Sequence, residues 1–93
     1  MAAQDGSGNT GGNASDPVKA VVEVIVRALV DQPDSVRVTE SERRGTTVLS
    51  LTTAPGDMGK IIGRQGRTAA ALRLLVALTA EKHGVRAQLD IRD

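Results

Sequence analysis

The chain has 93 residues, enough for one small domain, and its composition removes several classes of protein. It has no cysteine, which excludes disulfides and thiolate metal sites, and no Phe, Tyr or Trp, which excludes a sheet that stacks bases on aromatic rings. The core must therefore be built from Val, Ile, Leu and Ala. No signal-peptide pattern and no apolar run long enough for a bilayer is found, so we expect a cytoplasmic protein without a membrane partner.

The net charge is only +1, but it is distributed unevenly along the chain. Residues 1–16 hold two acids and no base, whereas residues 17–93 hold 12 bases against 9 acids. The first 15 residues are mainly Gly, Ser, Asn, Gln and Ala, a composition that cannot offset the entropy of ordering a chain. We therefore predict a disordered tail over residues 1–16 and a weakly basic domain over residues 17–93.

The first helix is predicted to follow Asp16-Pro17, because proline at the first helical position loses no hydrogen bond. The apolar residues that follow recur at helical spacing, although their β-branched side chains make a buried strand the competing prediction. They are also too numerous for one buried stripe. The additional apolar residues are expected either to face a second subunit or to be covered because the helix packs deeply against a sheet. These residues are Val18, Val21, Val22, Val24, Ile25, Val26, Ala28, Leu29 and Val30.

Three strands are predicted from the alternation of apolar and polar residues. Residues 35–41 and 46–53 flank a hairpin connection at residues 42–45, whose glycine supplies the unusual dihedral angle. Residues 85–91 alternate most clearly, with apolar side chains at every second position.

Two helices are predicted between the second and third strands. Asp57 is expected to cap a short helix over residues 58–62, and a longer helix over residues 68–80 ends before Gly84. The tetrapeptide Gly63-Arg64-Gln65-Gly66 joins them. Glycine lacks a Cβ, so another backbone can approach closely, and the amides at the start of the second helix suit an anion such as phosphate.

Basic residues surround this tetrapeptide. Between residues 58 and 80 the only charged side chains are Lys60, Arg64, Arg67 and Arg73. A run of this kind beside a glycine-rich loop favours a sugar-phosphate backbone as the ligand. The competing interpretation is a tight joint between two helices with an ordinary solvated surface.

The run Ile-Ile-Gly-Arg-Gln-Gly-Arg at residues 61–67 resembles the helix-GXXG-helix of KH domains, in which the loop clamps about four nucleotides of single-stranded nucleic acid. The wider run over residues 54–67, with Ala71-Leu72-Arg73 downstream, resembles small bacterial single-KH RNA-binding proteins of the KhpA type. The predicted order α-β-β-α-α-β is that of the type II KH fold. We therefore expect an α+β architecture with three helices on one face of a three-stranded mixed sheet.

We predict that single-stranded RNA binds at this loop, with phosphates on the basic side chains. The bases would lie on an aliphatic groove floored by Ile61, Ile62 or residues 46–51. Without aromatic rings each base loses a stacking contact worth about 1–3 kcal/mol, so binding is expected to be weak and loosely selective. The predicted RNA-binding residues are Lys60, Ile61, Ile62, Gly63, Arg64, Gln65, Gly66 and Arg67, with Arg73 as a further candidate.

The resemblance also implies protein partners. KhpA-type proteins associate with themselves and with a second KH-containing bacterial protein of the KhpB (Jag) type, which implies a homodimer and a heterodimer of that kind. The apolar excess over residues 18–30 and 69–80 agrees with a dimer surface. We predict a non-catalytic dimer that acts in post-transcriptional regulation or as an RNA chaperone. The alternative is a protein–protein interaction module with little or no RNA binding.

No enzymatic function is predicted. The run that begins at Gly56 lacks the spacing and the hydroxyl of a Walker phosphate-binding loop, and the glycines do not match a dinucleotide-binding fingerprint. His83 is the single histidine and lies beside a helix-ending glycine, so its expected role is at the helix C-terminus. No cluster suits zinc, and we expect neither a metal nor a cofactor.

Overall fold

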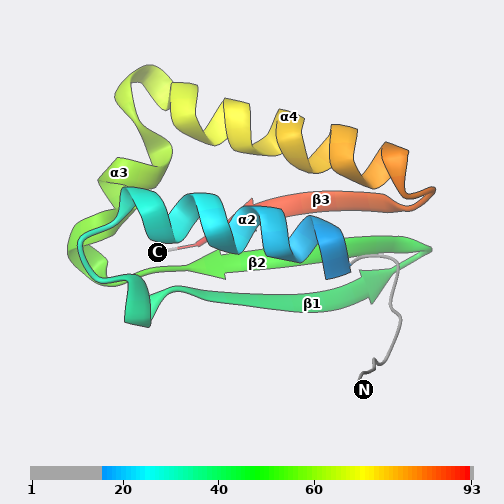
Figure 1. Cartoon of the computed structure of the whole chain (residues 1–93), viewed down its shortest axis with the longest axis horizontal. Coiled ribbons are helices and arrows are strands. Elements are labelled where there is room, and N and C mark those ends of the chain that lie inside the picture. The colour runs from blue at the N-terminus through cyan, green and yellow to red at the C-terminus, as the bar shows by residue number, and fades with distance from the viewer. Residues whose placement is uncertain (1–15, 93) are drawn as a thin grey trace, which may run out of the picture.

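The computed structural model describes residues 16–92 (Figure 1). The α-helices and strands follow the expected order α-β-β-α-α-β: α2 (Asp16–Leu29), β1 (Arg37–Arg43), β2 (Thr46–Thr52), α3 (Met58–Ile62), α4 (Arg67–Lys82) and β3 (Arg86–Ile91). Short 3-10 turns connect some of them: η1 (Pro33–Ser35), η2 (Pro55–Asp57) and η3 (Arg64–Gly66). The predicted tail lies outside the described residues, except for Asp16, with which α2 begins.

The sheet is mixed, as expected. Central β2 pairs antiparallel with β1 and parallel with β3. The hairpin between β1 and β2 is tighter than predicted, because β1 continues to Arg43 and only Arg44 and Gly45 form the turn. Both turn residues have positive φ, 53° and 81°, which is the conformation of a two-residue type I′ hairpin.

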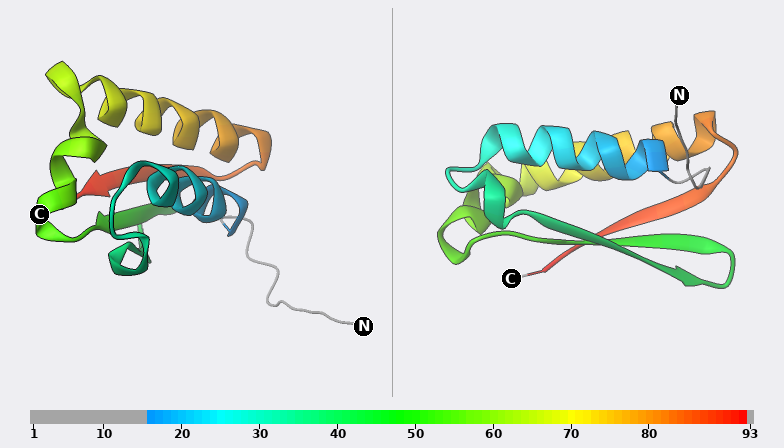
Figure 2. Two further views of the ribbon diagram at one scale, coloured as in Figure 1. Left: turned by 60° about the vertical axis from the view of Figure 1, so that its left-hand side comes forward. Right: turned by 60° about the horizontal axis from the view of Figure 1, so that its bottom comes forward.

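The three α-helices of the described chain cover one face of the sheet, which confirms the two-layer α+β architecture (Figures 1 and 2). Helices α2 and α4 lie side by side, and α3 lies at the end of the sheet where β2 finishes. The loop between α3 and α4 is therefore at the opposite end of the molecule from the β1–β2 hairpin (Figure 1).

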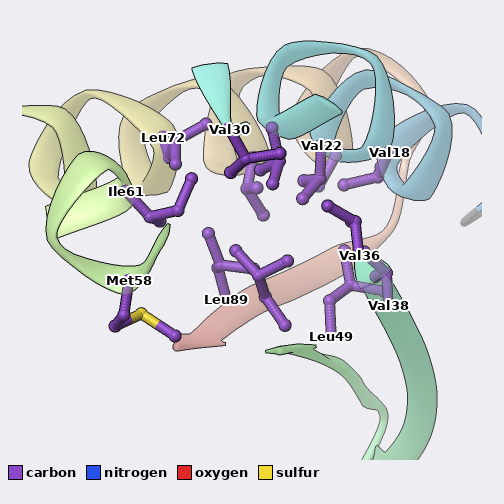
Figure 3. Packing of buried hydrophobic residues seen from close by; sticks show 14 residues of the cluster. Val18, Val22, Val30, Val36, Val38, Leu49, Met58, Ile61, Leu72 and Leu89 are labelled. Atoms are coloured by element: carbon purple, nitrogen blue, oxygen red, sulfur yellow. The ribbon is translucent and has the colours of Figure 1, made fainter. Parts of the chain in front are cut away.

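The core between the two layers consists of aliphatic side chains and Met58 (Figure 3). Helix α2 buries one residue per turn on the side that faces the sheet, and Leu49 of β2 is fully buried beneath it. Ile61 of α3 and Leu72 of α4 point into the same cluster. Because the short α3 is anchored in this way, the loop that follows it starts from a fixed point.

Two helices carry more apolar surface than the core uses. Val24 on α2 is 68% exposed. The first helix is therefore not deeply buried against the sheet, which was one of the two expectations from the sequence. Helix α4 exposes Leu74, Leu75 and Leu78 by 40–59% of their surface. Within residues 16–92 no helix combines the length and hydropathy that a membrane crossing requires.

The neighbouring residues Ile61 and Ile62 allow a test of this packing, because Ile61 is fully buried and Ile62 is 42% exposed. Ile61→Ala leaves a cavity and should lower the free energy of unfolding by about 2–5 kcal/mol, whereas Ile62→Ala should lower it by about 1 kcal/mol or less. Chemical denaturation of the two variants measures both values. Equal losses would contradict the burial described here.

Candidate nucleic-acid interface

Helix α3 is followed by Gly63, where the structure requires glycine for two reasons. The backbone angles, φ 74° and ψ 175°, lie in a region that is essentially restricted to glycine. A Cβ added there would overlap the Thr68 side chain and lie 3.0 Å from the Thr68 backbone nitrogen. The N–H of Gly63 also donates a hydrogen bond to the Gly59 carbonyl at 2.9 Å. Gly63 is therefore needed for the internal packing of the loop against α4.

Gly66 has a different role. It follows Gln65, and both residues are left-handed, with φ 58° for Gln65 and 74° for Gly66. A Cβ added at Gly66 would meet nothing within 4 Å. The space into which a side chain at this position would project is therefore open. The sequence prediction treated the two glycines alike, but a side chain would overlap Thr68 at Gly63 and would meet open space at Gly66.

Helix α4 begins at Arg67, directly after Gly66, and no side chain caps its first turn among the described residues. The positive end of its dipole therefore faces the loop. Arg64, Gln65 and Arg67 are exposed around it, and the Arg67 guanidinium donates to Gln65 Oε1 at 3.2 Å. Within residues 16–92 the Arg64 guanidinium has no ion pair or hydrogen bond. Two exposed guanidinium groups thus flank the start of the helix.

Lys60 lies at the base of the loop, between two carboxylates. Its Nζ is 3.1 Å from Asp31 Oδ2 and 3.7 Å from Asp57 Oδ1. The sequence predicted that Asp57 caps α3, but its buried side chain makes no capping hydrogen bond to that helix. Its carboxylate instead accepts hydrogen bonds from the backbone N–H groups of Asp31 and Gln32 at 3.2 and 3.0 Å. The hydrogen bond and charge of Asp31, followed by the charge of Asp57, raise the pKa of Lys60 and so stabilise its ammonium form further.

The predicted apolar floor requires a correction. Ile61 is fully buried, so its side chain supports the loop from inside and has no surface to offer a base. The apolar residues of β2 are also buried, with Leu49 and Leu51 fully enclosed. Ile62 is the exposed apolar residue of the predicted set, next to Gly63.

The structure separates Arg73 from the other predicted site residues. It lies six residues after Arg67 in α4, about 9 Å further along the helix axis, and is rotated to a different side. Arg73 is exposed.

Two hollows in the surface of the described chain are lined by residues outside the loop. The larger, of about 680 Å³, lies at the far end of the sheet, where Glu40, Glu42, Arg44 and Arg86 mix both signs of charge. A smaller hollow of about 340 Å³ adjoins Met58 at the start of α3. Among residues 16–92 no group of three or more His, Cys, Asp or Glu residues is arranged to hold a metal ion.

Comparison with known proteins agrees with this geometry. The sequence profile of the KhpA/KhpB KH domain matches residues 19–91, which include the loop and every strand and helix after the start of α2. This chain belongs to the KhpA/KhpB KH-domain family.

Relatives of the KhpA/KhpB family match over most of their length. The RNA-binding protein KhpA of Halalkalibacterium halodurans is 50% identical over 76 residues, which cover 82% of this chain and 100% of that protein. The proteins of the same name from Aquifex aeolicus and Chlamydia trachomatis are 45% and 40% identical, and the matches cover 80% and 82% of this chain and 94% and 97% of theirs. The resemblance inferred from the sequence is confirmed, and so is the KH fold.

The two glycines of this KH domain should respond differently to substitution. Gly63→Ala introduces both backbone strain and an overlap with Thr68, whereas Gly66→Ala introduces only a left-handed alanine in open space. We expect Gly66→Ala to lower the free energy of unfolding by about 1–2 kcal/mol and Gly63→Ala to lower it by more. Urea denaturation of both variants measures the order; a larger loss for Gly66→Ala would contradict the packing.

Proposed function

We propose that this KH domain is a non-catalytic protein that binds single-stranded RNA at its GXXG loop, residues 63–66. The observation that carries the proposal is the open backbone at Gly66, placed at the start of α4 between the exposed guanidinium groups of Arg64 and Arg67. The names of the relatives, RNA-binding protein KhpA, support the same conclusion.

In this proposal a phosphate lies against Gly66 and the first turn of α4. Planar guanidinium groups suit a phosphate because they can donate two parallel hydrogen bonds to its oxygens. Ile62 gives the adjoining sugar or base an apolar contact, while Ile61 holds α3 in place from the core. Lys60, Gly63 and Gln65 supply the remaining contacts to the RNA in this proposal. Because no aromatic ring is available for stacking, most of the affinity comes from the phosphates and falls with salt.

The cellular role that fits such a surface is post-transcriptional regulation or RNA chaperoning in the cytoplasm. Weak, phosphate-based binding allows one protein to engage many RNA sequences and to release them rapidly. An interaction module without RNA binding is the alternative.

The loop is tested by reversing its charge. The double variant Arg64→Asp/Gln65→Asp should lose at least about tenfold in affinity for a short unpaired oligoribonucleotide, because carboxylates then face the phosphates. Fluorescence anisotropy at low ionic strength measures the affinity, and circular dichroism checks the fold. Arg86→Asp/Gln88→Asp on β3 changes the net charge equally at the other end of the domain and should have a smaller effect. Unchanged binding by a folded loop variant would refute the proposal.

We also propose that the chain forms a homodimer through α4. Ala71, Leu74, Leu75 and Leu78 recur at the i, i+3, i+4, i+7 spacing of a helix face, and all four are exposed. This second apolar face lies outside the core, which uses Leu72 and its neighbours on the opposite side. A self-complementary pairing of two α4 helices would cover it. The same face would suit the heterodimer with a KhpB (Jag)-type KH protein.

The dimer is tested by placing acids on this face. Wild-type protein should sediment as a dimer at high micromolar concentration, and Leu74→Asp/Leu78→Asp should sediment as a monomer because four buried carboxylates would oppose association. Val24→Asp/Ala28→Asp on α2 places the same charges on the other exposed apolar surface and should remain a dimer. A monomeric wild type, or a dimer lost only in the α2 variant, would contradict the α4 interface.

A further inference from the structure

Asp31 is part of a closed set of contacts at the base of the loop. Its backbone N–H is held by Asp57 Oδ1, and its own carboxylate is 3.1 Å from the Lys60 ammonium, which also faces Asp57 Oδ1 at 3.7 Å. The backbone of Asp31 is therefore fixed by the buried carboxylate of Asp57. The Asp31 side chain is attached to this fixed backbone but has no hydrogen bond or ion pair other than that to Lys60 among residues 16–92.

The two acids differ in how easily a ligand can replace them. The Asp57 side chain is 3% exposed, whereas those of Lys60 and Asp31 are 45% and 76% exposed. A phosphate approaching the loop can reach the outer pair and cannot reach Asp57. The other two basic residues of the loop, Arg64 and Arg67, have no acidic partner in the described chain. Lys60 is thus the basic group at the loop whose charge is already matched by an acid.

On the basis of the RNA-binding function proposed above, we propose that Asp31 is a built-in competitor of RNA phosphate for Lys60 and so limits the affinity of the loop. A phosphate that contacts Lys60 must displace the Asp31 carboxylate, and until it does, the carboxylate repels it. Because exchange of one anion for another gains little, Lys60 adds less to binding than its position suggests. The Asp31 side chain can rotate away without disturbing the fold, since its backbone stays bound to Asp57.

Removing the charge of Asp31 should therefore strengthen RNA binding. Asp31→Asn should bind a short unpaired oligoribonucleotide about two- to fivefold more tightly than wild type at low ionic strength. Its log–log salt slope should be steeper by about 0.7, because Lys60 then binds a phosphate with release of a counterion. The control is Asp34→Asn, which removes an equal charge from the exposed η1 turn and should change affinity less.

A double-mutant cycle with Lys60→Ala shows whether the effect acts through Lys60. In a Lys60→Ala background, Asp31→Asn should give no more gain than Asp34→Asn does. The inference is overturned if Asp31→Asn matches Asp34→Asn in the wild-type background, or if its full gain persists without Lys60. These outcomes are distinct from failure of the proposed function, in which Arg64→Asp/Gln65→Asp binds RNA as wild type does. Circular dichroism confirms that each variant is folded.

Discussion

The site depends on the close contact between Gly63 and Thr68, which turns the chain from α3 into α4. The backbone of Gly63 lies so near Thr68 that no larger residue fits, and Ile61, two residues earlier, is fully buried in the core. Both anchors act on the inner side of the loop. Because Gly63 and Ile61 hold the loop on its inner side, Arg64, Gln65 and Gly66 are not needed for packing on the outer side. A backbone reversal that is already formed, with its outer side exposed, would spare a bound phosphate chain part of the entropy cost of ordering the loop.

The basic groups around the loop are not equivalent. Arg64 and Arg67 face solvent without acidic partners in the described chain, whereas Lys60 is held between a buried and an exposed carboxylate. The composition has no aromatic ring and only a small excess of positive charge, which also favours weak binding. Affinity in this account comes from a few phosphate contacts and is limited by an acid within reach of one of them. Such a surface suits short-lived binding to many RNAs better than tight recognition of one sequence.

Much of the fold could be predicted because its signals are local. Proline and glycine mark the ends of the elements, and the predicted bounds of the short helix, residues 58–62, are those of α3. The hairpin connection was predicted too long because Arg44 lies in the turn at φ 53°. Arginine seldom adopts this conformation, so the sequence gives no sign of it. The exposure of Val24 was likewise beyond sequence reasoning, since a helix with apolar residues on several sides does not reveal which side meets the sheet.

The candidate site was found from the GXXG spacing, but its environment was not. Asp31 and Asp57 are 26 residues apart, and only the packing of the end of α2 against α3 brings them together beside Lys60.

The central claim, that single-stranded RNA binds at the GXXG loop, is tested most directly by titrating the labelled protein with a short unpaired oligoribonucleotide at low ionic strength. The amide resonances of the protein are followed during the titration. We expect the largest shifts at residues 63–68 and small ones at the β1–β2 hairpin. Unmoved resonances at the loop would contradict the account.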